Sequence, residues 1–254
     1  MVSTGQTDAW SRAIAARRRR VARLLTTLSK SRTIGARGLH QLRTNLRRLE
    51  AWLDLVGDHD SAAKLDEDVS SLSHLRSMHT LEQWLIRHDA SPSDILAVRR
   101  LGRETARRLM IARVFTMIQQ TLDGVKSWTR PLGADEPGRT WSAHRSKLTG
   151  LLALLDRKPK RKRLHCLRLE LKQLRYQLEW TASHGESQKN LIVGLKKAQR
   201  CLGAHEELAS FRKLAKQLEL QSRPTIVKAW RRARKKARRY AGDMNWLLEA
   251  LDRL

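Results

Sequence analysis

Leucines recur at helical spacing along the chain, and segment 161–179 shows the pattern most clearly. At about 100° per residue, one face of a helix over this segment carries Leu164, Leu167, Leu171, Leu174 and Leu178. The neighbouring face carries Arg161, His165, Arg168, Lys172 and Arg175. The segment therefore predicts a helix in which a leucine seam lies beside an unbroken cationic stripe.

The same pattern occurs a second time, 125 positions earlier in the chain. The matching leucines are Leu39, Leu42, Leu46, Leu49 and Leu53. The matching polar positions are His40 and His165, Arg43 and Arg168, and Arg47 and Lys172. This internal repeat predicts that two related halves of the chain each present a cationic stripe.

Most of the remaining chain is also predicted to be helical, because no run rich in β-branched residues with alternating apolar and polar positions stands out. The expected helices span residues 7–29, 36–56, 61–87, 92–128, 141–156, 161–183 and 188–220, with a last helix from Arg223 to the C-terminus. Ser91 or Ser93 is the expected N-cap of the fourth helix, with Pro92 in its first turn. The last helix carries a four-three apolar repeat typical of helical bundles. The predicted fold class is all-α.

Residues 131–138 form the clearest linker, since two prolines and two glycines fall within them. We therefore expect an N-terminal four-helix bundle over residues 1–130 and a C-terminal four-helix bundle over residues 139–254. The shared helix order and the repeated histidine helix predict that the two bundles are related by an internal pseudo-twofold repeat.

Composition adds a strong positive charge to this picture. Lys and Arg number 52 against 25 Asp and Glu, a formal net charge of +27. Such an excess is self-repelling in a compact fold, so a polyanionic partner is expected. No apolar run reaches the length of a membrane span or a signal segment, which predicts no membrane partner and a cytoplasmic location. Cys166 and Cys201 are expected to be reduced thiols.

The cationic stripes suit a linear phosphate chain. Stripe neighbours on a helix are about 5–6 Å apart, a little more than the charge repeat of polyphosphate, and arginine binds phosphate oxygens through forked pairs of donors. His40 and His165 lie at the edges of the stripes and can bond a phosphate oxygen. No metal site and no cofactor are expected, because His165 and Cys166 point about 100° apart and no other ligand set has suitable spacing.

Two other function classes stay open. A nucleic-acid-binding protein could use the same basic faces, although most of the eight tryptophans lie on apolar helix faces, where core packing is expected. A phosphohydrolase acting on phosphate chains is the other alternative. No phosphate-binding glycine loop or nucleophile elbow is present, and metal-binding carboxylates are sparse. The sequence therefore predicts a binding protein that is not an enzyme.

The repeated segments resemble the conserved histidine α-helical domain, or CHAD, family, and the resemblance covers nearly the whole chain. The family's first-half motif is similar to Leu39-His40-x-Leu42-Arg43 with Arg47-Arg48-Leu49. Its second-half motif is similar to Leu164-His165-x-Leu167-Arg168 with Lys172, Leu174-Arg175-Tyr176 and Glu179. Segment 202–208 resembles the family's L-G-x-x-x-D-L turn, with Glu207 where Asp is usual. Segment 72–78 is a degenerate first-half version, with Ser73 replacing Gly.

The resemblance implies two four-helix bundles around a central basic groove or pore that binds inorganic polyphosphate, in a stand-alone member found on polyphosphate granules. Tyr176 and Glu179 would be orienting or packing partners. The residues expected to bind polyphosphate are His40, Arg43, Arg47, Arg48, His165, Arg168, Lys172 and Arg175, followed by a set chosen for stripe-like spacing alone: Arg17, Arg20, Arg103, Arg107, Arg231, Arg234 and Arg238. Lys189 and Lys196 are expected to lie outside this site.

Overall fold

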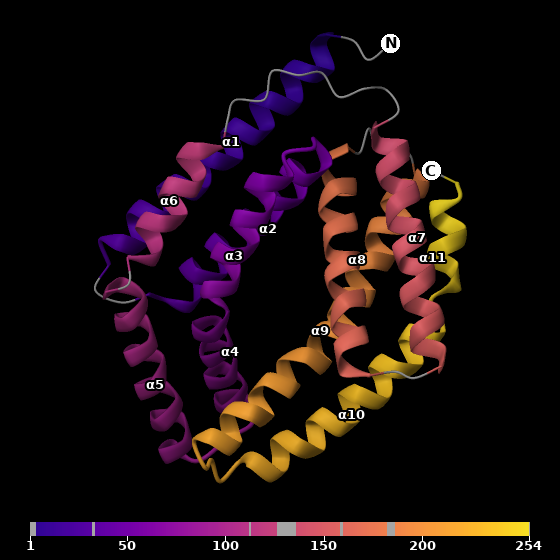
Figure 1. Cartoon of the computed structure of the whole chain (residues 1–254). Helices are drawn as coiled ribbons and strands as arrows, with labels where there is room; N and C mark the ends of the chain where they lie inside the picture. Colours follow the sequence, from indigo (N-terminus) through magenta and orange to yellow (C-terminus); the bar gives the residue numbers. More distant parts are fainter. Residues whose placement is uncertain are drawn as a thin grey trace. The chain divides into compact units, whose positions relative to one another are not determined.

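The computed structural model of the chain describes residues 4–31, 34–111, 113–125, 136–157, 160–181 and 186–253. Within these ranges every regular element is a helix (Figure 1). The helices are α1 (Thr4–Ser29), α2 (Ala36–Leu55), α3 (His59–Ser71), α4 (Ser73–Arg87), α5 (Pro92–Ile111), α6 (Val114–Gly124), α7 (Glu136–Arg157), α8 (Arg161–Thr181), α9 (Glu186–Gln217), α10 (Arg223–Gly242) and α11 (Asn245–Leu251). The predicted all-α fold class is confirmed.

The helices are divided between two compact units. The N-terminal unit contains residues 1–134 together with 220–222, and the C-terminal unit contains residues 135–219 and 223–254. Six described helices, α1–α6, belong to the first unit and five, α7–α11, to the second. The described residues therefore form more helices in each unit than the four that were expected for each half. Most of the predicted linker lies outside the described residues, and its last three positions, 136–138, begin α7.

Three helix breaks account for the larger number of helices. The helix expected over 61–87 is interrupted at Leu72, the one expected over 92–128 at Arg113, and the last one between Gly242 and Asn245. Arg113 has a φ of 52°, in the left-handed region that ends a helix. None of these breaks was predicted, because none carries the proline or Asn-Gly signal from which a turn is recognised in a sequence.

The core of the N-terminal unit is built on the α2 seam. Leu39, Leu42, Leu46, Leu49 and Leu53 are all 0–1% exposed, and full burial of each leucine stabilises the fold by about 2 kcal/mol. Helix α2 packs against α1 and α3, α4 packs against α5, and α6 packs against α3 (Figure 1). The predicted leucine seam of the first half is therefore confirmed as the centre of a core.

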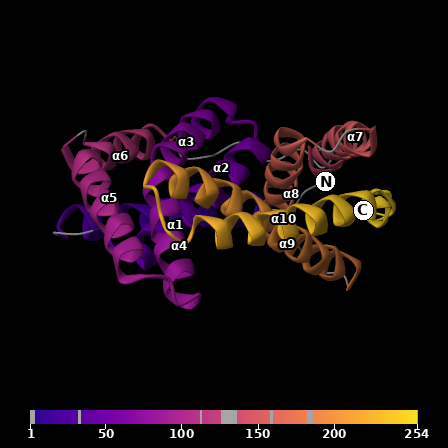
Figure 2. The same ribbon diagram turned by 90° about the horizontal axis from the view of Figure 1, so that it is seen from below.

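The core of the C-terminal unit is built on α8 in the same way. Its five seam leucines, from Leu164 to Leu178, are 0–2% exposed and pack against buried residues of α7 and α9. Helices α9 and α10 run side by side in both views (Figures 1 and 2). Trp246 of α11 covers Gly194 so closely that a Cβ there would lie 2.6 Å from the indole ring, so a larger residue at this position of α9 would force the ring to shift.

Local capping explains where α5 begins. The Ser91 hydroxyl accepts a hydrogen bond from the Asp94 amide at 3.3 Å, which confirms the predicted start of the fourth helix at Pro92. Asp94 itself is 3% exposed and accepts hydrogen bonds from the backbone amides of Gln221 (3.0 Å) and Ser222 (2.8 Å). These donors belong to the short segment 220–222 of the N-terminal unit.

Two further predictions concern the whole chain. Cys166 and Cys201 are free thiols, as expected. Across the part of the chain that the structure describes, no helix combines the length and the apolar character that crossing a membrane requires.

Candidate functional site

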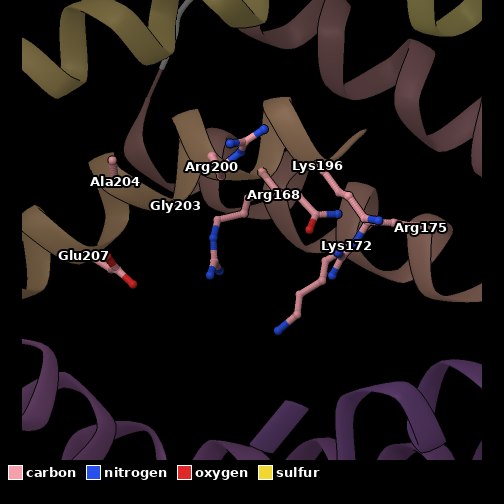
Figure 3. A pocket seen from close by; sticks show the side chains of 9 residues that line it. Arg168, Lys172, Arg175, Lys196, Arg200, Gly203, Ala204 and Glu207 are labelled. Atoms are coloured by element: carbon pink, nitrogen blue, oxygen red, sulfur yellow. The ribbon is translucent and has the colours of Figure 1, made fainter. Parts of the chain in front are cut away.

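A cationic cavity of about 520 Å³ lies along one face of the α8–α9 pair (Figure 3). It is lined by Arg168, Lys172 and Arg175 of α8 and by Lys196, Gln199, Arg200, Gly203, Ala204 and Glu207 of α9. The side chains of Arg168 and Lys172 point into the same open space, and Glu207 lies at its opposite end (Figure 3). The cavity, which we call the α8–α9 site, thus has five cations and one carboxylate in its lining.

Helical spacing explains why these residues meet. Arg168, Lys172 and Arg175 are separated by four and three positions, so they form one row beside the buried leucine seam of α8. Lys196, Arg200, Gly203 and Glu207 are separated by four, three and four positions and form a second row on α9. The apolar faces of α8 and α9 are buried in one shared core. The two polar rows beside those faces therefore border the same cavity.

Tyr176 and Glu179 hold part of the α8 row in place. The Tyr176 ring is buried, with the Arg175 guanidinium 4.5 Å and the Lys172 ammonium 5.6 Å from its centre. The Glu179 carboxylate lies 3.4 Å from Arg175 and 3.6 Å from Lys196. Cation–π contacts and ion pairs at such partly buried positions restrict the side chains without removing the excess positive charge.

Arg168 and Arg200 differ from these residues, because neither makes an ion pair or hydrogen bond with another described residue. Gly203 is a neighbour of Arg168 that offers it no side-chain hydrogen-bond acceptor. A Cβ added at Gly203 would lie 3.6 Å from Arg168 Nε, so the glycine presents no side-chain acceptor to the guanidinium. Two arginine forks therefore remain available to an anion in the cavity.

The first turn of the α8 stripe has a different environment. Arg161 donates two hydrogen bonds to Glu206 of α9, at 2.7 and 3.3 Å, and His165 Nδ1 lies 3.6 Å from the same carboxylate. Neither residue lines the α8–α9 site. The structure thus brings Arg168, Lys172 and Arg175 together and places His165, which was expected beside them, next to Glu206.

Comparison with known proteins identifies the family. The family model of the CHAD domain matches residues 12–216. The chain belongs to the CHAD family. A solved structure described as the CHAD domain from the plant Ricinus communis has the same fold, with a TM-score of 0.62 at 17% sequence identity, over 98% of this chain and 92% of that one. No curated protein matches the chain.

The CHAD match ends before α10, which holds three of the predicted binding residues. Arg231 is exposed, whereas Arg234 lies 5.4 Å from the Trp230 ring, on which Arg212 of α9 also packs at 4.1 Å. His205 stacks with the same ring at 6.5 Å and is 2% exposed. Burial lowers the pKa of His205, and the surrounding arginines lower it further against the effect of Glu206.

Two cations of the first-half stripe, Arg43 and Arg47, contact acceptors within the N-terminal unit. Arg43 donates to the Val69 carbonyl and, at 3.0 Å, to the Ser73 hydroxyl. Arg47 pairs with Glu50 at 2.8 Å and with Asp66. Burial by itself would lower the pKa of Arg47, but the two carboxylates raise it above its usual value.

The other predicted residues of the CHAD region are spread over its N-terminal unit. Arg17 donates to Asn45 at 2.6 Å and lies 4.7 Å from the Trp52 ring. Arg20 and His40 are exposed, and Arg48 is half-buried. Arg103 and Arg107 line a separate cavity on α5. Neither Arg43 nor Arg47 lines that cavity.

Sequence reasoning missed the α9 half of the site. Lys196 was expected to lie outside it, and Gln199, Arg200, Gly203 and Glu207 were not predicted as lining residues, although all line the cavity. Their spacing at 196, 200, 203 and 207 is the signal that predicts a common face. Segment 202–208, which resembles the family's turn motif, lies within α9, in agreement with the helix expected over 188–220. Among the described residues, no group of three or more His, Cys, Asp or Glu is placed to hold a metal ion.

Proposed function

We propose that this CHAD protein binds inorganic polyphosphate on the α8–α9 site. The observation that carries the proposal is the lining itself: five cations from two helices border one cavity of about 520 Å³, with Glu207 as the single carboxylate. A linear polyanion neutralises such a surface without needing a specific sequence of its own, and the overall charge of +27 attracts it over a longer range.

The two rows suit a chain of phosphates better than a single anion. Neighbouring positions within each row have Cβ atoms about 5–6 Å apart, so successive phosphates can each meet a different side chain. Arg168 and Arg200 supply forked donors, and Lys172 supplies a mobile point charge. Each added phosphate contact releases counterions, so binding should weaken steeply as salt rises, as it does for other linear polyanions.

The proposal is for binding and not for chain cleavage. Association with polyphosphate granules would follow from such binding wherever the polymer accumulates. To test the non-enzymatic assignment, the protein is incubated with long-chain polyphosphate and Mg²⁺ or Mn²⁺, and chain length is followed on a gel. We expect unchanged chains; release of more phosphate than there are protein molecules would assign a phosphohydrolase instead.

The binding test removes two site charges and compares them with two matched charges. Arg168→Gln with Arg200→Gln should weaken binding of long-chain polyphosphate about 30- to 150-fold, since each lost charge-assisted contact is worth about 1–1.5 kcal/mol. It should also reduce the slope of log affinity against log salt by about two. Isothermal titration calorimetry at several salt concentrations measures both quantities.

The matched control is Lys197→Gln with Lys213→Gln, which removes the same charge from exposed positions of α9 that do not line the cavity. We expect less than about a threefold change for this control. Equal losses in the two variants would mean that only net charge matters. A competition with RNA at equal charge concentration tests the nucleic-acid alternative, which gains support if RNA displaces polyphosphate.

A further inference from the structure

A second cavity lies within the N-terminal unit. It runs along helices α4 and α5, which pack against each other (Figure 1). Its volume is about 770 Å³, within the range of about 300–1,000 Å³ that is usual for small-molecule sites. The apolar residues of its lining are Ile34, Met78, Val98, Gly102, Ala106 and Met110. The cavity, which we call the α4–α5 cavity, therefore has a mainly apolar floor, unlike the α8–α9 site.

Helix α5 gives this cavity two different sides. Val98, Gly102, Ala106 and Met110 recur every four positions and form an apolar row, while Arg99, Arg103 and Arg107 each follow one position later and form a cationic row beside it. Gly102 is buried, and a Cβ there would meet only Met78, at 3.9 Å. The small residues in the middle of the apolar row keep the floor open.

The charges on the cationic row are only partly neutralised. Glu82, which also lines the cavity, pairs with Arg99 at 2.5 Å. Arg103 and Arg107 are exposed and make no ion pair with another described residue. The lining also contains His79, whose Nδ1 atom is buried without a hydrogen-bond partner among the described residues. Burial of the ring lowers the pKa of His79, against the opposing effect of Glu82.

We propose that the α4–α5 cavity binds a single-chain amphiphile with one anionic head group, of the class of a medium-chain fatty acid. The hydrocarbon chain lies on the apolar row and the carboxylate meets Arg103 and Arg107. Charge complementarity selects an anionic head, because the cationic row carries two guanidinium groups without a carboxylate. The apolar floor selects a hydrocarbon body, since contact with a bare polyphosphate chain would leave that floor unfilled.

This site lies in a different unit from the α8–α9 site and takes a different class of ligand, so it goes beyond polyphosphate binding. The test is calorimetric titration of the full chain with dodecanoate below its micelle-forming concentration. Dodecyltrimethylammonium has the same chain with a cationic head, and inorganic phosphate is an anion without a chain. We expect saturable one-to-one binding of dodecanoate and at least about tenfold weaker binding of both comparison compounds.

Two variants divide the site into its head-group and chain contributions. Arg103→Gln with Arg107→Gln should weaken dodecanoate binding about tenfold, whereas Arg100→Gln with Arg108→Gln should change it less than about twofold. The second pair removes the same charge from exposed positions of α5 that do not line the cavity. Ala106→Trp keeps every charge and fills the floor, so it should abolish dodecanoate binding while far-ultraviolet circular dichroism remains helical.

Three results would overturn the proposal. One is equal binding of dodecyltrimethylammonium, which would indicate adsorption of the chain alone. Another is displacement of dodecanoate by an equal concentration of inorganic phosphate. The last is an equal loss of affinity in the Arg100 and Arg108 variant. Polyphosphate titration of Ala106→Trp keeps the two proposals apart, because that substitution should leave polyphosphate affinity unchanged whether or not dodecanoate binds.

Discussion

Helices α2 and α8 carry the same motif but present it to different neighbours. Both bury five leucines at equivalent positions, and both place two cations at the matching polar positions, Arg43 and Arg47 in α2 and Arg168 and Lys172 in α8. In α2 these cations contact acceptors of α3 and α4. In α8 they line a cavity with further cations from α9. The repeat therefore conserves the helix and not the environment of its charges.

One pair of equivalent positions shows how the difference arises. Ser73 stands in the first half where the related segment of the second half has Gly203. The Ser73 hydroxyl accepts a hydrogen bond from Arg43 at 3.0 Å, whereas Gly203 leaves the guanidinium of Arg168 without such an acceptor. A single side-chain oxygen therefore helps to decide whether the stripe arginine stabilises the fold or remains available to a ligand.

The largest expected effect separates these roles. Arg168→Gln with Lys172→Gln should weaken polyphosphate binding about 30-fold or more and leave the free energy of unfolding within about 0.5 kcal/mol. Arg43→Gln with Arg47→Gln should instead destabilise the fold by about 2–4 kcal/mol, because the Val69 carbonyl, the Ser73 hydroxyl and the half-buried Glu50 lose their donors. Urea denaturation and calorimetric titration of both variants measure the contrast, which fails if both lose affinity equally.

A smaller effect concerns acid stability. Helix α9, the neighbour of α8, holds the buried His205, whose pKa is lowered by burial and nearby arginines. The unfolded chain then binds a proton more readily than the folded one, so His205 contributes less stability as pH falls from about 6.5, the ordinary value. Denaturation at pH 7.5 and pH 5.5 should show a smaller acid-induced loss for His205→Gln than for the unchanged protein; an equal loss would contradict this assignment.

The smallest expected effect comes from exchanging the two equivalent side chains. Gly203→Ser should give Arg168 a hydroxyl acceptor and weaken polyphosphate binding about two- to threefold, the size expected for one neutral hydrogen bond in competition with a ligand. Gly203→Ala is the matched control, since it adds a Cβ in ordinary contact with Arg168 but no oxygen. If alanine weakens binding as much as serine, bulk and not hydrogen bonding explains the effect.

Leucine periodicity was sufficient to predict the helical class and both seams, because a buried leucine leaves a local and regular signal. Breaks such as the one at Leu72 carry no such signal; tertiary packing decides them. The α8 row of the site was also predictable from spacing. Arg200 and Lys196 were not, because which helix packs beside α8 depends on contacts that no single helix encodes. The pairing of Arg47 with Asp66, across 19 positions, was missed for the same reason.

The hydrogen bonds of Asp94 carry a consequence for the order in which the chain folds. The donors at Gln221 and Ser222 lie 127 and 128 positions after the carboxylate. During synthesis, the N-terminal unit emerges long before the segment that completes it. Until residue 222 has left the ribosome, the Asp94 carboxylate lacks these donors and stays hydrated, so the last step in closing the first unit waits until all of α9 has been made.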